Sequence, residues 1–231
     1  MAWLPTTLRA GLAAAAGALA VGGYAPFYGY PLSLLGLAAL FSLWRGAAPA
    51  RGAALGFAWG LGFFGFGVSW VYVSLTEFGG MPVWMGVLGV TLFCALLAAY
   101  PALVGWLYAR FCARAPGWLV LPALWMLAEW LRGWLFTGFP WLQLGYSQIP
   151  GSPLAAYAPL LGVLGVGLAT SLSAALLVAL AAGPHRLRAA LGLAFVWALA
   201  AALGQAQWTH PVGAPVRVAL LQGDVAQTMK W

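Results

Sequence analysis

Charged residues are scarce in this 231-residue chain, which has ten Lys and Arg residues and three Asp and Glu residues, 6% of the sequence. An ordinary soluble domain is about 25% charged and about 45–50% apolar, whereas 64% of this chain is hydrophobic. So few charges cannot keep a protein of this size in water, and the high hydrophobicity excludes intrinsic disorder. The composition therefore excludes both a soluble domain and a disordered chain.

Cysteine and histidine are also rare. Cys94 and Cys112 lie in or just after one apolar segment, 82–109. On a continuous helix they would be roughly 27 Å apart, which is too far for a disulfide. His185 and His210 have no metal-ligand spacing, so we expect no metal site and no cofactor. The net charge is +7, but the basic residues are spread along the chain in ones and twos, so we expect no nucleic-acid partner.

Long apolar runs are what the sequence has in abundance. Stretches of about 18 or more apolar residues are typical of membrane-spanning helices. We therefore predict an all-α polytopic membrane protein with about seven transmembrane helices. The seven apolar segments are 10–23, 31–44, 53–75, 82–109, 117–135, 157–182 and 189–205.

The basic residues predict an orientation for these helices. The connections 24–30, 77–81 and 136–157 carry no Lys or Arg. Lys and Arg gather on the cytoplasmic side of membrane proteins, so the pattern predicts a cytoplasmic N-terminus and a C-terminal tail on the opposite side. Seven of the ten basic residues then lie in the cytoplasm, namely Arg9, Arg45, Arg51, Arg110, Arg114, Arg186 and Arg188.

The tail differs in character from the rest of the chain. Pro211, Gly213 and Pro215 interrupt the apolar pattern, and residues 216–224 then predict a buried strand. A single strand is not stable alone, so either it pairs with another chain or the sequence stops at the start of a second domain. We expect the second arrangement, with a transmembrane domain over 1–210 and the truncated beginning of another domain over 211–231.

Two charges inside one apolar segment are the clearest candidates for function. Glu129 and Arg132 are three residues apart and share one helix face. Charges within spans are costly and usually face a partner or a cavity. They could form an ion pair with each other at the interface. Alternatively, Arg132 could bind a phospholipid phosphate or a substrate, because its guanidinium can bond two phosphate oxygens.

An unusually aromatic loop follows these charges and contains Trp141, Tyr146 and Gln148. Aromatic residues at the boundary between lipid and water are ordinary membrane anchors. Alternatively, this loop could lie on the membrane and shape an entry for an acyl chain. The candidate lipid contacts are therefore these three residues together with Glu129 and Arg132.

Three segments carry a family resemblance: 23–27 (Gly-Tyr-Ala-Pro-Phe), 67–71 (Gly-Val-Ser-Trp-Val) and, most specifically, 129–148. They resemble the membrane half of bacterial apolipoprotein N-acyltransferases. The tail 218–231 resembles the first strand and turn of that family's nitrilase-like (carbon–nitrogen hydrolase) domain. Trp231 matches a Lys-Trp pair at the edge of the family's active-site region, which makes it a further candidate for substrate contact.

The resemblance implies an acyltransferase of the bacterial inner membrane, with eight spans and a periplasmic nitrilase-like domain. Such an enzyme moves an acyl chain from a membrane phospholipid to the α-amino group of the N-terminal S-diacylglyceryl-cysteine of an apolipoprotein. The family uses a Glu, Lys and Cys triad and a thioester acyl-enzyme. The carboxylate accepts the thiol proton, the thiolate attacks the phospholipid ester, and the lysine stabilises the oxyanion. We expect no cofactor and a monomeric protein.

This triad has no counterpart within the 231 residues. Lys230 is the only lysine, and neither Cys94 nor Cys112 has a carboxylate near it in the sequence. We therefore expect the triad to lie beyond Trp231 and the chain alone to be inactive. Two other classes stay open: a non-enzymatic membrane scaffold that offers its tail to a partner, and a transporter. The scarcity of ionisable groups within the spans disfavours a transporter.

Overall fold

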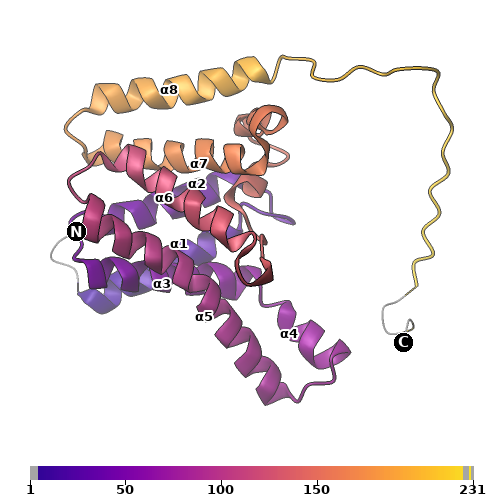
Figure 1. Ribbon diagram of the computed structural model, residues 1–231, viewed down its shortest axis with the longest axis horizontal. Helices are drawn as coiled ribbons and strands as arrows, with labels where there is room; N and C mark the ends of the chain where they lie inside the picture. Colours follow the sequence, from indigo (N-terminus) through magenta and orange to yellow (C-terminus); the bar gives the residue numbers. More distant parts are fainter. Residues whose placement is uncertain (1–4, 226–228, 230–231) are drawn as a thin grey trace.

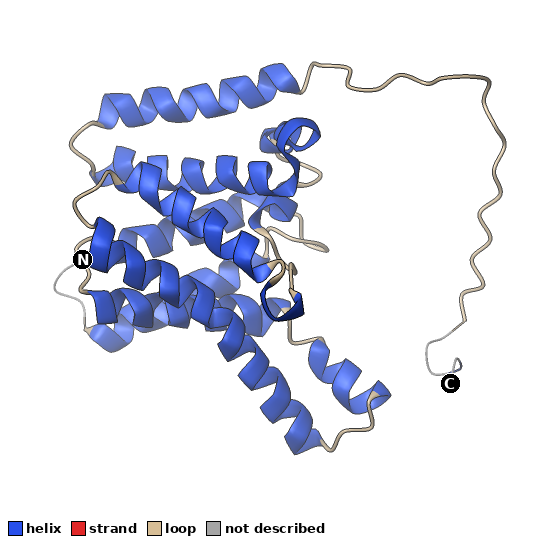
Figure 2. Cartoon of the chain, viewed as in Figure 1, coloured by secondary structure: helices blue, strands red, loops and turns tan. Residues whose placement is uncertain are grey.

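A computed structural model describes residues 5–225 and 229 of the chain. Within these residues the chain forms helices and no strand (Figure 2). The α-helices are α1 (Thr6–Val21), α2 (Tyr30–Trp44), α3 (Pro49–Gly67), α4 (Val71–Val73), α5 (Val83–Leu107), α6 (Gly117–Arg132), α7 (Ala158–Ala182) and α8 (Arg186–Leu203). Short π- or 3₁₀-helical segments are η1 (Ser74–Phe78), η2 (Tyr108–Cys112), η3 (Leu135–Thr137), η4 (Leu144–Gln148) and η5 (Pro153–Tyr157).

Each of the seven predicted apolar segments contains a helix, as expected for an all-α membrane protein. Among the residues that the structure describes, three helical stretches are long and apolar enough to cross a membrane: Val83–Cys112, Pro153–Ala182 and Arg186–Leu203. By contrast, α1, α2 and α6 have only 15 or 16 residues. A helix of that length reaches about 24 Å, which is less than the roughly 30 Å hydrocarbon core of a bilayer. The number of seven spans therefore stays a prediction.

The predicted segment 53–75 is two helices and not one. Helix α3 ends at Gly67, and the next helical stretch, Val71–Phe78, is bent by 59° from it, so that the pair together would count as a fourth span. Glycine is a poor helix former, and α3 contains several glycines near this end. The bend carries α4 and η1 out of the bundle, where they lie beside the N-terminal half of α5 (Figure 1).

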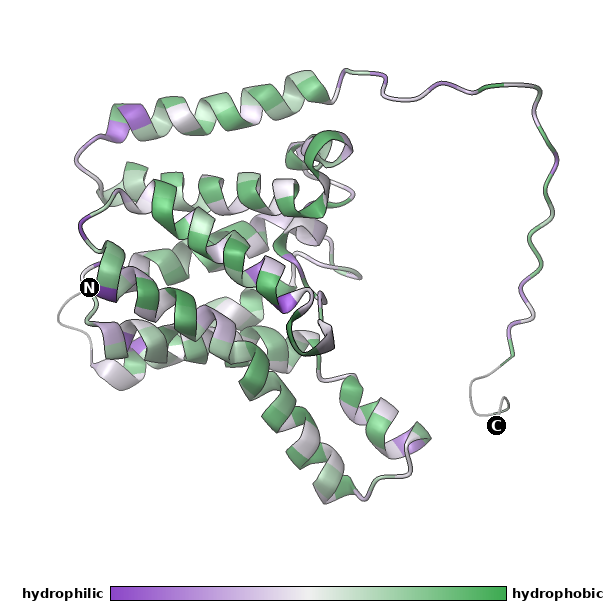
Figure 3. Ribbon diagram, viewed as in Figure 1, coloured by the Kyte–Doolittle hydropathy of each residue, from purple (hydrophilic) through white to green (hydrophobic). Residues whose placement is uncertain are grey.

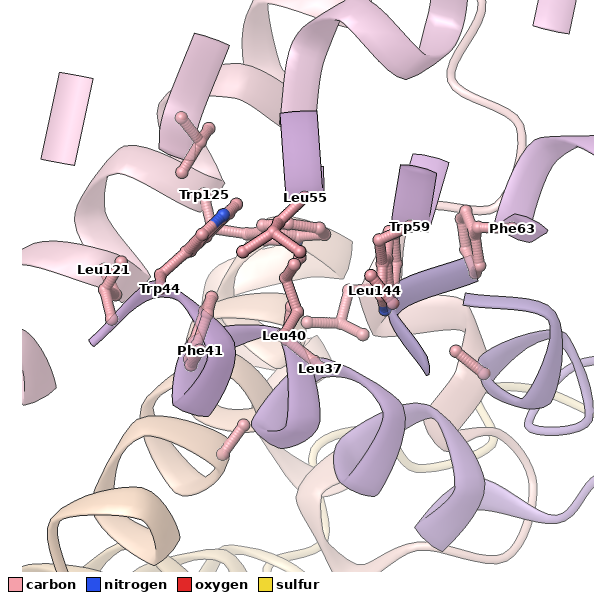
Figure 4. Packing of buried hydrophobic residues seen from close by; sticks show 14 of the residues in the cluster. Leu37, Leu40, Phe41, Trp44, Leu55, Trp59, Phe63, Leu121, Trp125 and Leu144 are labelled. Carbon is pink, nitrogen blue, oxygen red and sulfur yellow. The ribbon is translucent and has the colours of Figure 1, made fainter. Parts of the chain in front are cut away.

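Aromatic side chains from several helices make the centre of the bundle (Figure 4). The indole of Trp59 on α3 stacks on Phe63, with ring centroids 4.7 Å apart, and meets the edge of Trp125 on α6 at 5.3 Å. Its Nε1 donates a hydrogen bond to the Gly36 carbonyl on α2 at 3.1 Å. A single buried side chain thus contacts both α2 and α6 from α3.

Close backbone contacts join α3 to its neighbours through glycine. A Cβ at Gly62 would collide with the backbone of Ala14 on α1, and a Cβ at Gly56 would collide with Pro101 on α5. Small residues permit such approach where lipid supplies no hydrophobic drive between helices. By contrast, a Cβ at Gly65 would meet no atom within 4 Å. The predicted packing role of the α3 glycines therefore applies to some of them and not to others.

This difference leads to a first testable prediction. We expect Gly62→Ala to lower the free energy of unfolding by about 1–3 kcal/mol, because overpacking forces backbones apart. We expect Gly65→Ala, in the same helix, to leave stability unchanged or slightly raised, since alanine favours the helix. Thermal unfolding of the two variants in the same detergent compares them directly. Equal melting temperatures would contradict the close α1–α3 contact.

The two ends of the bundle differ in polarity. The end of α2, the connection between α5 and α6 and the start of α8 lie at one end (Figure 1). These segments carry Arg45, Arg114 and Arg188, which line one pocket. The opposite end carries the 22–29 connection, the 133–157 connection and the start of the tail (Figure 1). The helix arrangement thus separates the basic connections from the aromatic ones, as the sequence predicts.

The tail does not form the predicted strand. Residues 216–224 have no regular secondary structure, and their side chains are exposed. A strand requires a partner for its backbone hydrogen bonds, and none lies beside it among the described residues. The prediction of a strand at 216–224 is therefore wrong for this chain as it stands. Whether a second domain begins at 211 stays a prediction.

Candidate functional site

The C-terminal end of α6 and the loop after it form the most polar part of the interior. Helix α6 runs to Arg132, where Gly133 caps it with backbone hydrogen bonds to Glu129 and Trp130. Glu129 is only 6% exposed and Arg132 only 3%. Two buried charges in an apolar bundle require partners.

Glu129 binds the backbone of the loop. Its carboxylate accepts a hydrogen bond from the Leu144 N–H, at 2.9 Å from Oε1 and 3.2 Å from Oε2. Oε1 also accepts from the Trp125 indole at 3.3 Å. These donors satisfy the carboxylate inside the bundle and fix the start of η4 against α6.

Arg132 holds the same loop from its other end. Its Nη1 donates to the carbonyl of Phe139 at 2.7 Å and also to that of Trp141. Its guanidinium lies over the Phe64 ring, 5.4 Å from the centroid, a favourable cation–π distance. Its Nη2 is 3.9 Å from Glu129 Oε1, a long ion pair. We call Glu129, Arg132 and the loop backbone that they bind the clamp.

The loop follows an unusual backbone path between these contacts. Phe136, Thr137 and Leu142 have φ values of 54°, 72° and 56°, in the left-handed region that residues other than glycine rarely adopt. Such conformations persist only where the surroundings enforce them. The clamp supplies part of that enforcement, and Tyr24 adds to it by donating from its hydroxyl to the Leu142 carbonyl at 3.0 Å.

Tyr24 lies in the connection between α1 and α2, and its phenol is buried. Burial raises the pKa of the Tyr24 phenol well above its usual range, and the nearby Glu129 carboxylate raises it further, while Arg132 opposes the shift. Tyr24 therefore remains a hydrogen-bond donor at physiological pH. Sequence analysis missed this contact. The only signal for it is that Tyr24 lies in a connection predicted on the same side as the aromatic loop.

Gln148 is a second buried polar group at the end of this loop. It is fully buried, and its Nε2 donates to the Ser147 hydroxyl at 2.8 Å. That hydroxyl donates in turn to the Leu144 carbonyl at 2.7 Å. The Gln148 Oε1 has no hydrogen-bond partner among the described residues. Gln148 therefore belongs to the same buried network as the clamp.

The outer surface of the loop is aromatic. Trp141 is 49% exposed and Tyr146 53%. The Trp141 ring lies 5.2 Å from that of Trp70, which immediately precedes α4. Half-exposed aromatic side chains at the end of a membrane bundle suit the boundary between lipid and water.

The structure brings some predicted site residues together and separates others. Glu129 and Arg132 form the clamp, and Gln148 lies in the adjoining network, whereas the side chains of Trp141 and Tyr146 lie on the outer surface. Trp231 lies outside the described residues. A direct contact of any of these side chains with lipid stays a prediction.

Little free space lies beside the clamp. A cavity of about 20 Å³ lies beside Glu129 and Arg132, with Trp59 and Tyr100 also in its wall. A space of this size holds about one water molecule. Cys94 is buried mid-helix in α5, and its thiol donates to the Phe64 carbonyl at 3.5 Å. The described contacts of Glu129 and Arg132 therefore position the loop, and the absence of catalytic residues from this chain stays a prediction.

Comparison with known proteins identifies the family of the chain. Residues 16–176 match the sequence model of the apolipoprotein N-acyltransferase N-terminal domain. The chain is 50% identical over 222 residues to the apolipoprotein N-acyltransferase of Nitrosomonas europaea, covering 94% of this chain and 44% of that protein. It is 46% identical over 226 residues to the protein of the same name from Methylococcus capsulatus, covering 95% and 44%. The chain thus spans less than half the length of the curated relatives that it matches.

Proposed function

The chain belongs to the apolipoprotein N-acyltransferase family, and from this premise we propose that it is the membrane part of an enzyme that matures bacterial lipoproteins. The acyl donor is a membrane phospholipid, and the acceptor is the α-amino group of an apolipoprotein's N-terminal S-diacylglyceryl-cysteine. The reaction passes through a thioester on a cysteine outside these residues. The match of residues 16–176 to the family's N-terminal domain carries this proposal.

The part that this chain takes in the reaction follows from its architecture. The bundle anchors the enzyme in the inner membrane with seven spans, and the tail from residue 211 leads into a periplasmic nitrilase-like domain. The polarity of the two ends supports this topology, because the basic connections lie at the end opposite the tail (Figure 3). The aromatic loop lies at the tail's end of the bundle (Figure 1), next to where the catalytic domain would sit.

The loop is the part of this chain best placed to meet the acyl donor. The clamp fixes its backbone, while Trp141 and Tyr146 remain half exposed. A rigid backbone with exposed aromatic rings can receive an acyl chain without first becoming ordered. We propose that this surface guides the phospholipid toward the catalytic domain.

Acyl transfer is the decisive test of the proposal. The protein in its full natural length is purified and incubated with phospholipid carrying a labelled acyl chain and with a diacylglyceryl-cysteine peptide. We expect the label to move to the peptide amine, and we expect residues 1–231 alone to give no transfer. Failure of the full-length protein to transfer the label, while a known family member does so in parallel, would refute the proposed function.

A labelling experiment tests the proposed orientation. Single cysteines are introduced at Ala48, beside the basic end, and at Gly151, in the opposite connection, after Cys94, Cys112 and every other cysteine of the full-length protein are replaced by serine. We expect a membrane-impermeant maleimide to label Gly151→Cys in intact inner-membrane spheroplasts. Ala48→Cys should react only after permeabilisation, so it serves as the matched control. The reverse pattern would contradict a cytoplasmic N-terminus.

A further inference from the structure

A second cavity lies away from the clamp, at the basic end of the bundle. It has a volume of about 900 Å³ and lies between the end of α2, the start of α6, the second half of α7 and the first half of α8. Small-molecule pockets have volumes of roughly 300–1,000 Å³, so this space is large enough for a sizeable ligand. We call it the basic groove.

The walls of the basic groove are apolar along its length. Leu121 of α6, Leu176 of α7 and Phe195 of α8 face it. The groove exists because α8 packs mainly on α7 and η5 and stands apart from α6 (Figure 1). A hydrocarbon chain is the natural occupant of such a lining inside a membrane.

The rim of the groove is positively charged. Arg45, Arg114 and Arg188 line it, and they come from three different connections or helix ends. The chain has three acidic residues in all, Glu77, Glu129 and Asp224, and none of them lines the groove. Three guanidinium groups without a carboxylate are complementary to an anionic group, and arginine matches the oxygens of a phosphate especially well.

One of the three arginines is already held in place. The Arg45 Nη2 donates to the carbonyl of Ala182, the last residue of α7, at 2.7 Å. This bond ties the end of α2 to the end of α7 and keeps the guanidinium at the mouth of the groove. The Arg45 side chain therefore loses less conformational freedom when a ligand binds.

We propose that the basic groove binds one anionic glycerophospholipid of the cytoplasmic leaflet. The headgroup phosphate lies between Arg45, Arg114 and Arg188, and an acyl chain lies along the gap between α6 and α8. Basic pockets between helices on the cytoplasmic side suit acidic lipid headgroups. The proposal depends on the bundle lying in a membrane with this end in the cytoplasm, and it does not depend on the acyl-transfer reaction.

Native mass spectrometry of the full-length protein in detergent tests this site. The delipidated protein is titrated with palmitoyl-oleoyl phosphatidylglycerol, or with the phosphatidylcholine that has the same chains. We expect tighter binding of the phosphatidylglycerol. The double variant Arg114→Gln/Arg188→Gln should weaken that binding by tenfold or more, since each basic residue near a headgroup contributes about fivefold. Arg51→Gln is the matched control, because Arg51 lies at the same end in α3 but does not line the groove.

A second variant and a second ligand separate the possible occupants. Ala179→Phe places a ring in the groove wall without removing a charge, and we expect it to reduce lipid binding as well. Inorganic phosphate at millimolar concentration should not displace the lipid. Equal binding of the two lipids, unchanged binding in the double arginine variant, or displacement by free phosphate would each overturn the proposal.

Discussion

Replacing Glu129 by glutamine is expected to lower the free energy of unfolding by about 3–5 kcal/mol, the cost of removing one partner from a buried ion pair. The substitution keeps the size of the side chain but leaves the Arg132 charge buried without a counter-charge. The glutamine side chain can face the Leu144 N–H with its NH₂ group, which is a donor, or with its oxygen, which is a neutral acceptor. Either contact is weaker than the one that the carboxylate makes. For a chain of this length, the melting temperature should fall by on the order of 10 °C.

The matched control is Glu77→Gln, which makes the same chemical change at an exposed glutamate in η1. We expect it to leave unfolding unchanged, because a solvated charge contributes little to stability. Limited proteolysis adds a readout of the loop itself. Cleavage within residues 135–148 should become faster in Glu129→Gln and not in Glu77→Gln. Equal stability and equal cleavage of the two variants would show that the clamp does not hold the loop.

Exchanging the two charges is not a simple swap at this site. In the double variant Glu129→Arg/Arg132→Glu, the new arginine and the Leu144 N–H would both be hydrogen-bond donors. The new glutamate and the Phe139 carbonyl would both be acceptors. The double variant should therefore be less stable than Glu129→Arg alone or Arg132→Glu alone. A gain in stability relative to Glu129→Gln would mean that the ion pair matters more than the loop contacts.

Trp59→Ala is expected to lower the free energy of unfolding by about 3–5 kcal/mol, the usual cost of removing a buried aromatic side chain. Trp59 is 2% exposed, packs against Phe63 and Trp125, and donates to the Gly36 carbonyl. Its removal opens a cavity at the point where α3 meets α2 and α6. The Gly36 carbonyl also loses the indole donor, which adds to the cost.

Two comparisons separate these effects. Trp84→Ala removes the same side chain at a position that is 67% exposed on α5, and we expect a much smaller change in thermal unfolding in detergent. Trp59→Phe fills most of the cavity but cannot donate the hydrogen bond, so its stability should lie between Trp59→Ala and the unsubstituted protein. If Trp59→Ala and Trp84→Ala unfold at the same temperature, the indole of Trp59 is not part of a tightly packed core.

Sequence alone predicts the helices well because hydrophobic length is a local property. The seven apolar segments all contain helices, and the connections that carry Arg45, Arg114 and Arg188 lie at one end of the bundle. The proximity of Glu129 and Arg132 can likewise be predicted from their spacing, since residues three apart share a helix face. Two features of the fold depended on more than local pattern: the break after Gly67 and the missing strand at 216–224.

The partners of the clamp could not be predicted in this way. They are backbone groups of a loop whose path depends on left-handed conformations at Phe136, Thr137 and Leu142, residue types that do not favour that region. The glycines of α3 illustrate the same limit. Gly62 and Gly65 look equivalent in the sequence, yet only Gly62 lies against another backbone.

Within the loop, Glu129 and Arg132 bind main-chain atoms. Arg132 binds two loop carbonyls, and Glu129 binds one loop N–H, so no loop side chain takes part in these bonds. Substitutions at the outward-facing positions, such as Trp141 and Tyr146, can therefore alter the surface while the loop keeps its shape.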